Sequence, residues 1–163
     1  MTTLLKAAAA TLALGTPTLA AADAATNLDT LRAFYAALDS DGVTSEELAA
    51  YFAPDFEDHN RSPMLPAEMT DFEAHVAVLS GVTAAFSEEA HDIQVMETLG
   101  DGSVLVAWDF AGTHSGAFFG VPATGRQVLM SGMDIYTFGA DGKIVAQRHV
   151  EDVAGLMAQI GAP

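Results

Sequence analysis

The chain has 163 residues, half of them apolar, with 22 acidic and 6 basic side chains and no cysteine. A net charge of −16 leaves no basic surface for phosphates, so we expect no nucleic-acid partner. The lack of cysteine excludes disulfide bonds, thiolate metal sites and a cysteine nucleophile. The length and apolar content suit one globular domain that folds without such cross-links.

The N-terminal residues have the pattern of an export signal. Lys6 gives a single positive charge, residues 7–15 form a short apolar run, and small residues accumulate up to Ala24. The run is too short to span a bilayer, and Pro17 interrupts it, although a retained anchor is the alternative. We therefore predict a signal peptide over 1–24, one domain over 25–163, and a periplasmic or secreted protein. No later segment has 18 consecutive apolar residues, so we expect no membrane span.

The first half of the domain reads as helical. Asn27 is a candidate cap for a helix ending near Leu38, where the Asp39–Gly42 turn follows. Two capping boxes open further helices, and a polar loop over 55–66 is predicted between them. These boxes are Thr44 with Glu47, opening a short helix that stops near Pro54, and Thr70 with Glu73, opening a longer helix with Phe72, Val76, Leu79, Val82 and Phe86 on one face.

The second half alternates with the period of strands. We predict strands near 91–99, 103–115, 127–139 and 143–151 and a closing helix over 152–160. The turn sequences at 100–102 and 141–142 are typical of antiparallel neighbours, so the strands should form a meander. Helices followed by a curved antiparallel sheet make an α+β fold in one domain.

The last predicted hairpin places a carboxylate beside an imidazole. With a two-residue loop at 141–142, Tyr136 pairs with Gln147 and Asp134 pairs with His149. Such a pair can do general acid/base chemistry, because a carboxylate fixes the histidine tautomer and raises the ring's basicity. The alternative is a structural cross-strand ion pair, worth about 1 kcal/mol or less.

The surroundings of this pair are apolar on both faces of the hairpin. Val128, Met130, Tyr136, Phe138 and Val145 are expected on the face of Asp134 and His149, whereas Leu129, Met133, Ile135, Ile144 and Val150 are expected on the other face. One face should line the core or a pocket, and the other could pack on a second subunit. We expect a homodimer.

Other histidines give weaker signals. Trp108, Phe110 and His114 should share one face of their strand, and His59 in the polar loop could lie over one end of a cavity. Each is more often a structural histidine than a catalytic one. His75 and His91 are assigned to surface or helix-end positions, without a role. No local spacing of metal ligands occurs, so we expect no metal site.

Three segments together make the sequence recognisable. The run Gly112-Thr113-His114-Ser115-Gly116, continuing to Gly120-Val121-Pro122-Ala123-Thr124-Gly125-Arg126, is followed by Asp141-Gly142-Lys143-Ile144 and by residues 152–161. Together they resemble the SnoaL-like polyketide cyclases, also called ester cyclases, over essentially the whole domain. This resemblance implies the nuclear-transport-factor-2-like fold, a cone in which a strongly bent sheet wraps three helices around an apolar pocket. It also implies ring closure by intramolecular aldol condensation without metal or cofactor.

The resemblance also points to site residues. The family's acid/base aspartate lies on the last strand after an arginine, a position that aligns with His149 after Arg148. The family's histidine on the preceding strand aligns with Asp134, so the two residue types are exchanged here.

Our main hypothesis is a cofactor-independent enzyme in which His149 and Asp134 move a proton on a small hydrophobic carbonyl or ester compound. His114, His59 and Tyr136 would hydrogen-bond the substrate, and Trp108, Phe110 and Phe138 would form the pocket walls. The alternative is an exported, non-catalytic binding module of the same fold for a small molecule or peptide.

Overall fold

The computed structural model describes residues 24–63 and 65–161, so the predicted signal peptide lies almost entirely outside the described residues. Over these residues four helices and five strands make up the α+β fold expected from the sequence, with one strand more than the four that were predicted. They are α1 (Ala24–Leu38), α2 (Ser45–Ala49), β1 (Phe52–Asp58), α3 (Asp71–Ala85), β2 (Phe86–Thr98), β3 (Val104–His114), β4 (Gln127–Phe138), β5 (Ile144–Glu151) and α4 (Val153–Ile160). No helix among these residues is long and apolar enough to cross a membrane.

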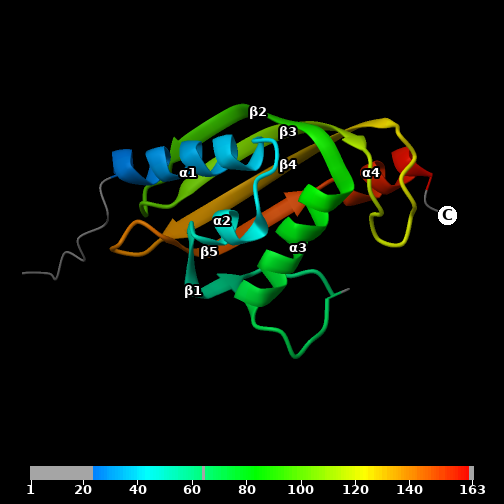
Figure 1. Cartoon of the computed structure of the whole chain (residues 1–163). Coiled ribbons are helices and arrows are strands. Elements are labelled where there is room, and N and C mark those ends of the chain that lie inside the picture. The colour runs from blue at the N-terminus through cyan, green and yellow to red at the C-terminus, as the bar shows by residue number, and fades with distance from the viewer. Residues whose placement is uncertain (1–23, 64, 162–163) are drawn as a thin grey trace, which may run out of the picture.

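The five strands form one curled sheet in the order β1-β5-β4-β3-β2. The predicted antiparallel meander of β2 to β5 is confirmed, with two irregularities of register between β2 and β3. Helices α1, α2 and α3 lie on one side of this sheet, and α4 lies at the end of the sheet near the C-terminus (Figure 1).

Strand β1 corrects the prediction of a polar loop beginning at residue 55. It pairs in parallel with β5 and forms an edge of the sheet. Pro54 is exposed within it, as is common for proline in edge strands, where a missing N–H disturbs no partner. Phe52 and Phe56 are 2 % and 3 % exposed, so burial of these two rings against the helices outweighs the polar composition of the segment.

Alternation along β3 decides where the core lies. Its even-numbered residues from Val104 to His114 are buried, including Trp108 and Phe110, and its odd-numbered residues are more exposed. These side chains face Leu31, Phe34 and other residues of the helices in one hydrophobic cluster. The strand face predicted from period-two alternation is therefore the inner face of the sheet.

Both predicted capping boxes are confirmed. Thr44 and Thr70 accept from the backbone N–H groups of Glu47 and Glu73, whose carboxylates accept in return from the threonine backbones. The predicted cap at Asn27 is wrong, because α1 already begins at Ala24 and Asn27 is buried within it.

The β4–β5 hairpin has the predicted register where it matters for the site. Tyr136 lies opposite Gln147, and Asp134 lies opposite His149. Near the turn the register shifts, so that Ile144 pairs with Phe138 and is fully buried. Ile144 therefore belongs to the core, which corrects its assignment to the outer face.

Candidate active site

The half-buried imidazole of His149 lies between two carboxylates on the inner side of the sheet edge. Its Nε2 atom hydrogen-bonds Asp58 Oδ1 at 3.2 Å, and its Nδ1 atom lies 3.6 Å from Glu151 Oε1. Glu151 is two residues further along β5, so its side chain leaves the same face of the strand. Asp58 is brought to the cluster by β1, the strand next to β5.

The two carboxylates govern the charge of this imidazole. The hydrogen bond with Asp58 and the interaction with Glu151 raise the pKa of His149 to about 10, although burial opposes this rise. Burial alone would raise the pKa of Asp58, but hydrogen bonds from His149 and from the Asn60 backbone hold it below its ordinary value. The cluster therefore contains an imidazolium beside carboxylates at neutral pH.

The segment after β1 holds Asp58 in place. The Asp58 N–H donates to Asp71 Oδ2 at 3.1 Å, and Arg61 donates to the other oxygen of Asp71 at 3.4 Å. Asn60 Oδ1 accepts from the backbone N–H of His149 at 3.2 Å. Asp58 and Asn60 were not predicted as site residues, because only the pairing of β1 with β5 brings their polar segment to His149.

A second, fully buried polar cluster surrounds Asp134. Its Oδ2 atom accepts from Tyr35 Oη at 3.0 Å and from Trp108 Nε1 at 2.5 Å, and its Oδ1 atom accepts from Gln147 Nε2 at 2.7 Å. The hydroxyls of Tyr35 and Tyr136 lie 3.2 Å apart. Both oxygens of this carboxylate are thus satisfied by side chains of α1, β3 and β5.

A glycine makes room for one of these donors. Trp108 lies opposite Gly132 in the β3–β4 register. A Cβ atom at Gly132 would lie 2.1 Å from Cζ2 of the indole. The indole ring therefore lies directly over the glycine backbone, and from there its N–H reaches Asp134.

Burial dominates the titration of this second cluster. It raises the pKa of Asp134 above its ordinary value, against the hydrogen bonds from Trp108 and Gln147. Burial, together with the nearby Asp134 charge, raises the pKa of both Tyr35 and Tyr136 well above its ordinary value. Both tyrosines are therefore neutral hydrogen-bonding groups at neutral pH.

The predicted Asp134–His149 pair is adjacent in register, but each side chain has other partners. The Asp134 carboxylate is bonded by Tyr35, Trp108 and Gln147, whereas the imidazole contacts Asp58 and Glu151. The expectation that Asp134 orients the His149 ring directly is therefore corrected, because Asp58 and Glu151 hold that ring. The charge of Glu151 acts on Asp134 as well as on His149, so the two clusters adjoin.

The remaining predicted site residues are distributed over the fold. His114 is fully buried, with Nδ1 3.0 Å from Thr124 Oγ1, and lies six residues along β3 from Trp108, about 20 Å away. His59 is exposed on the segment after β1. Phe110 belongs to the hydrophobic core, and Phe138, at the end of β4, is partly buried against that core. The structure therefore gathers Trp108 and Tyr136 around Asp134 but does not bring His114 there.

Two histidines that received no role from the sequence are partly buried and pack against other side chains of the fold. The His91 side chain is 7 % exposed, and its Nδ1 atom lies 2.6 Å from Asp39 Oδ1. The partly buried ring of His75 in α3 packs against Phe52 and Phe56, with ring centroids 4.3 and 5.0 Å away. These contacts correct the assignment of both histidines to the surface. The residues around each histidine are distant in the sequence, so a polar residue type alone does not indicate its environment.

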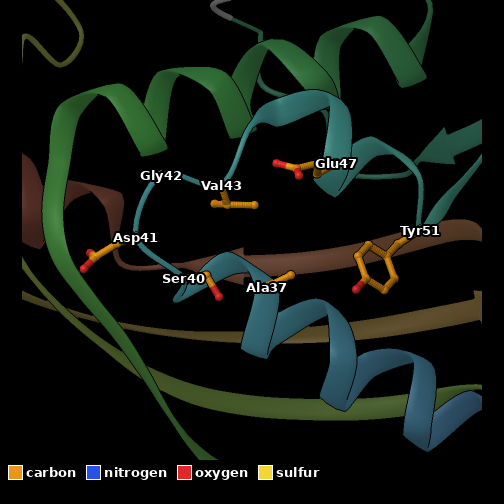
Figure 2. Close-up of a pocket in the computed structure, with 7 residues that line it drawn as sticks. All are labelled: Ala37, Ser40, Asp41, Gly42, Val43, Glu47 and Tyr51. Carbon is orange, nitrogen blue, oxygen red and sulfur yellow. The ribbon is translucent and has the colours of Figure 1, made fainter.

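A surface pocket of about 390 Å³ lies away from these clusters, between the end of α1 and α2. Figure 2 shows Val43, Glu47 and Tyr51 around it, opposite Ala37 and Ser40 of the α1 end. None of the residues predicted for the site lines it. Over the described residues, no group of three or more His, Asp or Glu side chains has an arrangement that could hold a metal ion.

Comparison with known proteins places this geometry in a family. The model of the SnoaL-like polyketide cyclase family matches residues 29–160. The chain is 33 % identical over 125 residues to the aklanonic acid methyl ester cyclase DauD of Streptomyces sp. (strain C5), covering 76 % of this chain and 73 % of DauD. It is also 33 % identical over 114 residues to the aklanonic acid methyl ester cyclase DnrD of Streptomyces peucetius, covering 69 % and 73 %.

Solved structures agree with the fold. Wild-type IdmH from Streptomyces antibioticus superposes with a TM-score of 0.66 at 30 % identity, over 83 % of this chain and 98 % of IdmH. TsrD from Streptomyces laurentii superposes with a TM-score of 0.69 at 22 % identity, over 85 % and 97 %. The resemblance seen in the sequence is confirmed, and the chain belongs to the SnoaL-like polyketide cyclase family.

Proposed function

We propose that this protein is an ester-cyclase-type enzyme that carries out general acid/base chemistry on a small hydrophobic carbonyl or ester compound. The observation that carries the proposal is the His149 imidazole held between Asp58 and Glu151 on the inner side of the sheet. An imidazolium in such a place can stabilise negative charge on a substrate oxygen and then transfer its proton to it.

The proposed reaction is an intramolecular aldol ring closure. Glu151 accepts a proton from an acidic carbon of the substrate, and the resulting enolate carbon attacks a carbonyl carbon of the same molecule. A carbon–carbon bond forms, the carbonyl π bond breaks, and the His149 imidazolium protonates the resulting alkoxide. Protonated Glu151 then returns its proton to His149 Nδ1, which lies 3.6 Å from its carboxylate. The product is an isomer of the substrate.

Exposure favours Glu151 over Asp58 as the base. The Glu151 side chain is 30 % exposed, whereas the Asp58 side chain is 9 % exposed and already accepts two hydrogen bonds on one oxygen. We assign Asp58 the role of holding His149. We assign Asp134 a positioning role, because its carboxylate fixes the Tyr35, Trp108 and Gln147 side chains beside the reacting groups.

The names of two relatives support a proposal for the substrate class. DauD and DnrD are cyclases of aklanonic acid methyl ester. We propose a hydrophobic ester of the same kind for this chain, and aklanonic acid methyl ester is therefore the probe for a first assay.

The assay compares the purified wild-type protein with His149→Gln and Glu151→Gln, measuring consumption of the ester and formation of a cyclised isomer. Both variants should lose about 100-fold or more in rate, since a positioned acid or base contributes at least that factor. Arg148→Gln is the matched control, because this neighbouring side chain on β5 is exposed on the other face. A His149→Gln variant with the wild-type rate would refute the assignment. Binding of the ester without turnover in the wild type would instead support a non-catalytic binding module.

We further propose that residues 1–24 are removed on export, so that the domain over 25–163 acts in the periplasm or outside the cell. N-terminal mass analysis of exported protein tests this, and an intact Met1 on the exported chain would contradict it.

We also propose a homodimer. The outer face of the sheet exposes Leu129, Met133 and Val150 to 69 %, 46 % and 66 %. Apolar surface of this kind is covered in many oligomers. Sedimentation analysis should show a dimer at micromolar concentration, and a monodisperse monomer would count against it.

A further inference from the structure

The partly buried side chain of His75 lies within electrostatic range of the proposed reacting groups, although it has no part in the steps above. It sits one turn into α3, with its ring against Phe52 and Phe56 of β1. The charges of Asp58, His149 and Glu151 all act on it. Three separate elements, α3, β1 and β5, thus meet at this point.

One atom of His75 is without a partner. Its Nε2 is buried and makes no hydrogen bond with any described residue. Buried polar atoms in folded proteins are nearly always paired with protein, with ordered water or with a ligand. Phenylalanine at this position would avoid the cost of the unpaired atom and would keep the ring contacts. Packing alone therefore does not explain a histidine at this position, and we look for a hydrogen-bond partner of Nε2 outside the protein chain.

The two neighbouring histidines have different charges at neutral pH. Burial lowers the pKa of His75 to about 4, with the nearby Asp58 charge opposing this effect, whereas the pKa of His149 is raised to about 10. At neutral pH His75 is therefore a neutral imidazole and His149 an imidazolium. Titratable groups whose environments separate their pKa values in this way are typical of acid/base sites. A neutral imidazole can donate one hydrogen bond without adding charge.

We propose that His75 is a substrate-binding residue, whose Nε2–H donates a hydrogen bond to a carbonyl oxygen of the compound on which His149 and Glu151 act. This inference rests on the proposed function, because it assigns a further contact to the same site. The substrate would then contact the His149 cation on β5 and a neutral donor, His75, on α3. Two contacts from different elements would fix the orientation of the carbonyl group that is attacked.

The first test observes the contact directly. Protein labelled with ¹⁵N in its histidines is titrated with aklanonic acid methyl ester, and the Nε2 resonance of His75, assigned by its loss in His75→Phe, is followed. A saturable change in this resonance is expected. If the resonance stays fixed, the inference is overturned, whether or not His149 responds to the ester.

The second test separates binding from packing. His75→Phe keeps the ring contacts with Phe52 and Phe56, so its urea midpoint should equal or exceed that of the wild type. Its kcat/KM for the ester should nevertheless fall at least tenfold, as expected for loss of a donor to the reacting carbonyl. Ser80→Ala, on the exposed side of α3, should change neither quantity.

Failure of this inference is distinguishable from failure of the proposed function. A His75→Phe protein with kcat/KM within twofold of the wild type would overturn the role of His75 and leave the enzyme assignment intact. A wild-type protein that never converts the ester would refute the enzyme, while the resonance of His75 would still report whether the contact forms.

Discussion

The ion pairs of His149 should make the stability of this protein fall as the pH rises. The folded pKa of about 10 lies above the ordinary 6.5, so the stabilisation is complete below pH 6.5 and is lost as the pH rises to about 10. At 1.36 kcal/mol per pKa unit the rise corresponds to roughly 5 kcal/mol. Because His149 is partly open to water, solvent screening reduces this to about 2–3 kcal/mol.

Urea unfolding of the wild type and of His149→Gln measures this contribution, since the difference between them cancels other titrating groups. The free-energy difference should decrease by about 2–3 kcal/mol between pH 6 and pH 10. The difference should also decrease on acidification below about pH 4. The pKa of Asp58 is lowered in the folded protein, so its ion pair with His149 stabilises the fold above the ordinary pKa of an aspartate, and this stabilisation is lost as Asp58 becomes protonated. A difference that is constant from pH 6 to pH 10 would refute the His149 ion pairs.

Further variants test the supports of the site. Gly132→Ala should displace the Trp108 indole from Asp134 and cost about 1–3 kcal/mol of stability, visible as a change in tryptophan fluorescence and a lower urea midpoint. Asp134→Asn replaces one acceptor oxygen by an NH2 donor, which would face the donor of Gln147 or those of Tyr35 and Trp108, and should cost about 1–3 kcal/mol; unchanged thermal stability would contradict the hydrogen-bond network. Thr70→Ala removes a helix cap and should cost about 0.5–2 kcal/mol by urea unfolding, with equal stability counting against the capping box.

Local rules made much of the fold predictable. Threonine followed three residues later by glutamate marked the starts of α2 and α3, and alternation marked the inner face of β3. The predicted two-residue turn at 141–142 does not describe the loop, because Phe138 lies opposite Ile144; a register shift next to Phe138 compensates, so Asp134 and His149 still lie opposite each other. The capping boxes and the alternation depend on neighbours in sequence, and that is why local patterns suffice for them.

The partners of the site residues required the tertiary structure. Asp58 reaches His149 only because β1 adds to the edge of the sheet beside β5, in a segment whose polarity suggested a loop. The environment of His75 depends on rings that lie about twenty residues away along the chain. Long-range strand pairing and burial of a polar residue both contradict local propensity, so no window of the sequence signals them.

The rate at which deuterium from D₂O enters aklanonic acid methyl ester tests the central claim most directly, because it reports proton removal from carbon even before ring closure. Wild-type protein should accelerate this exchange above the rate in buffer, and His149→Gln, which lacks the imidazolium that stabilises the enolate, should accelerate it about 100-fold less. Exchange that the wild type does not accelerate, or that His149→Gln accelerates equally well, would contradict acid/base chemistry at this site.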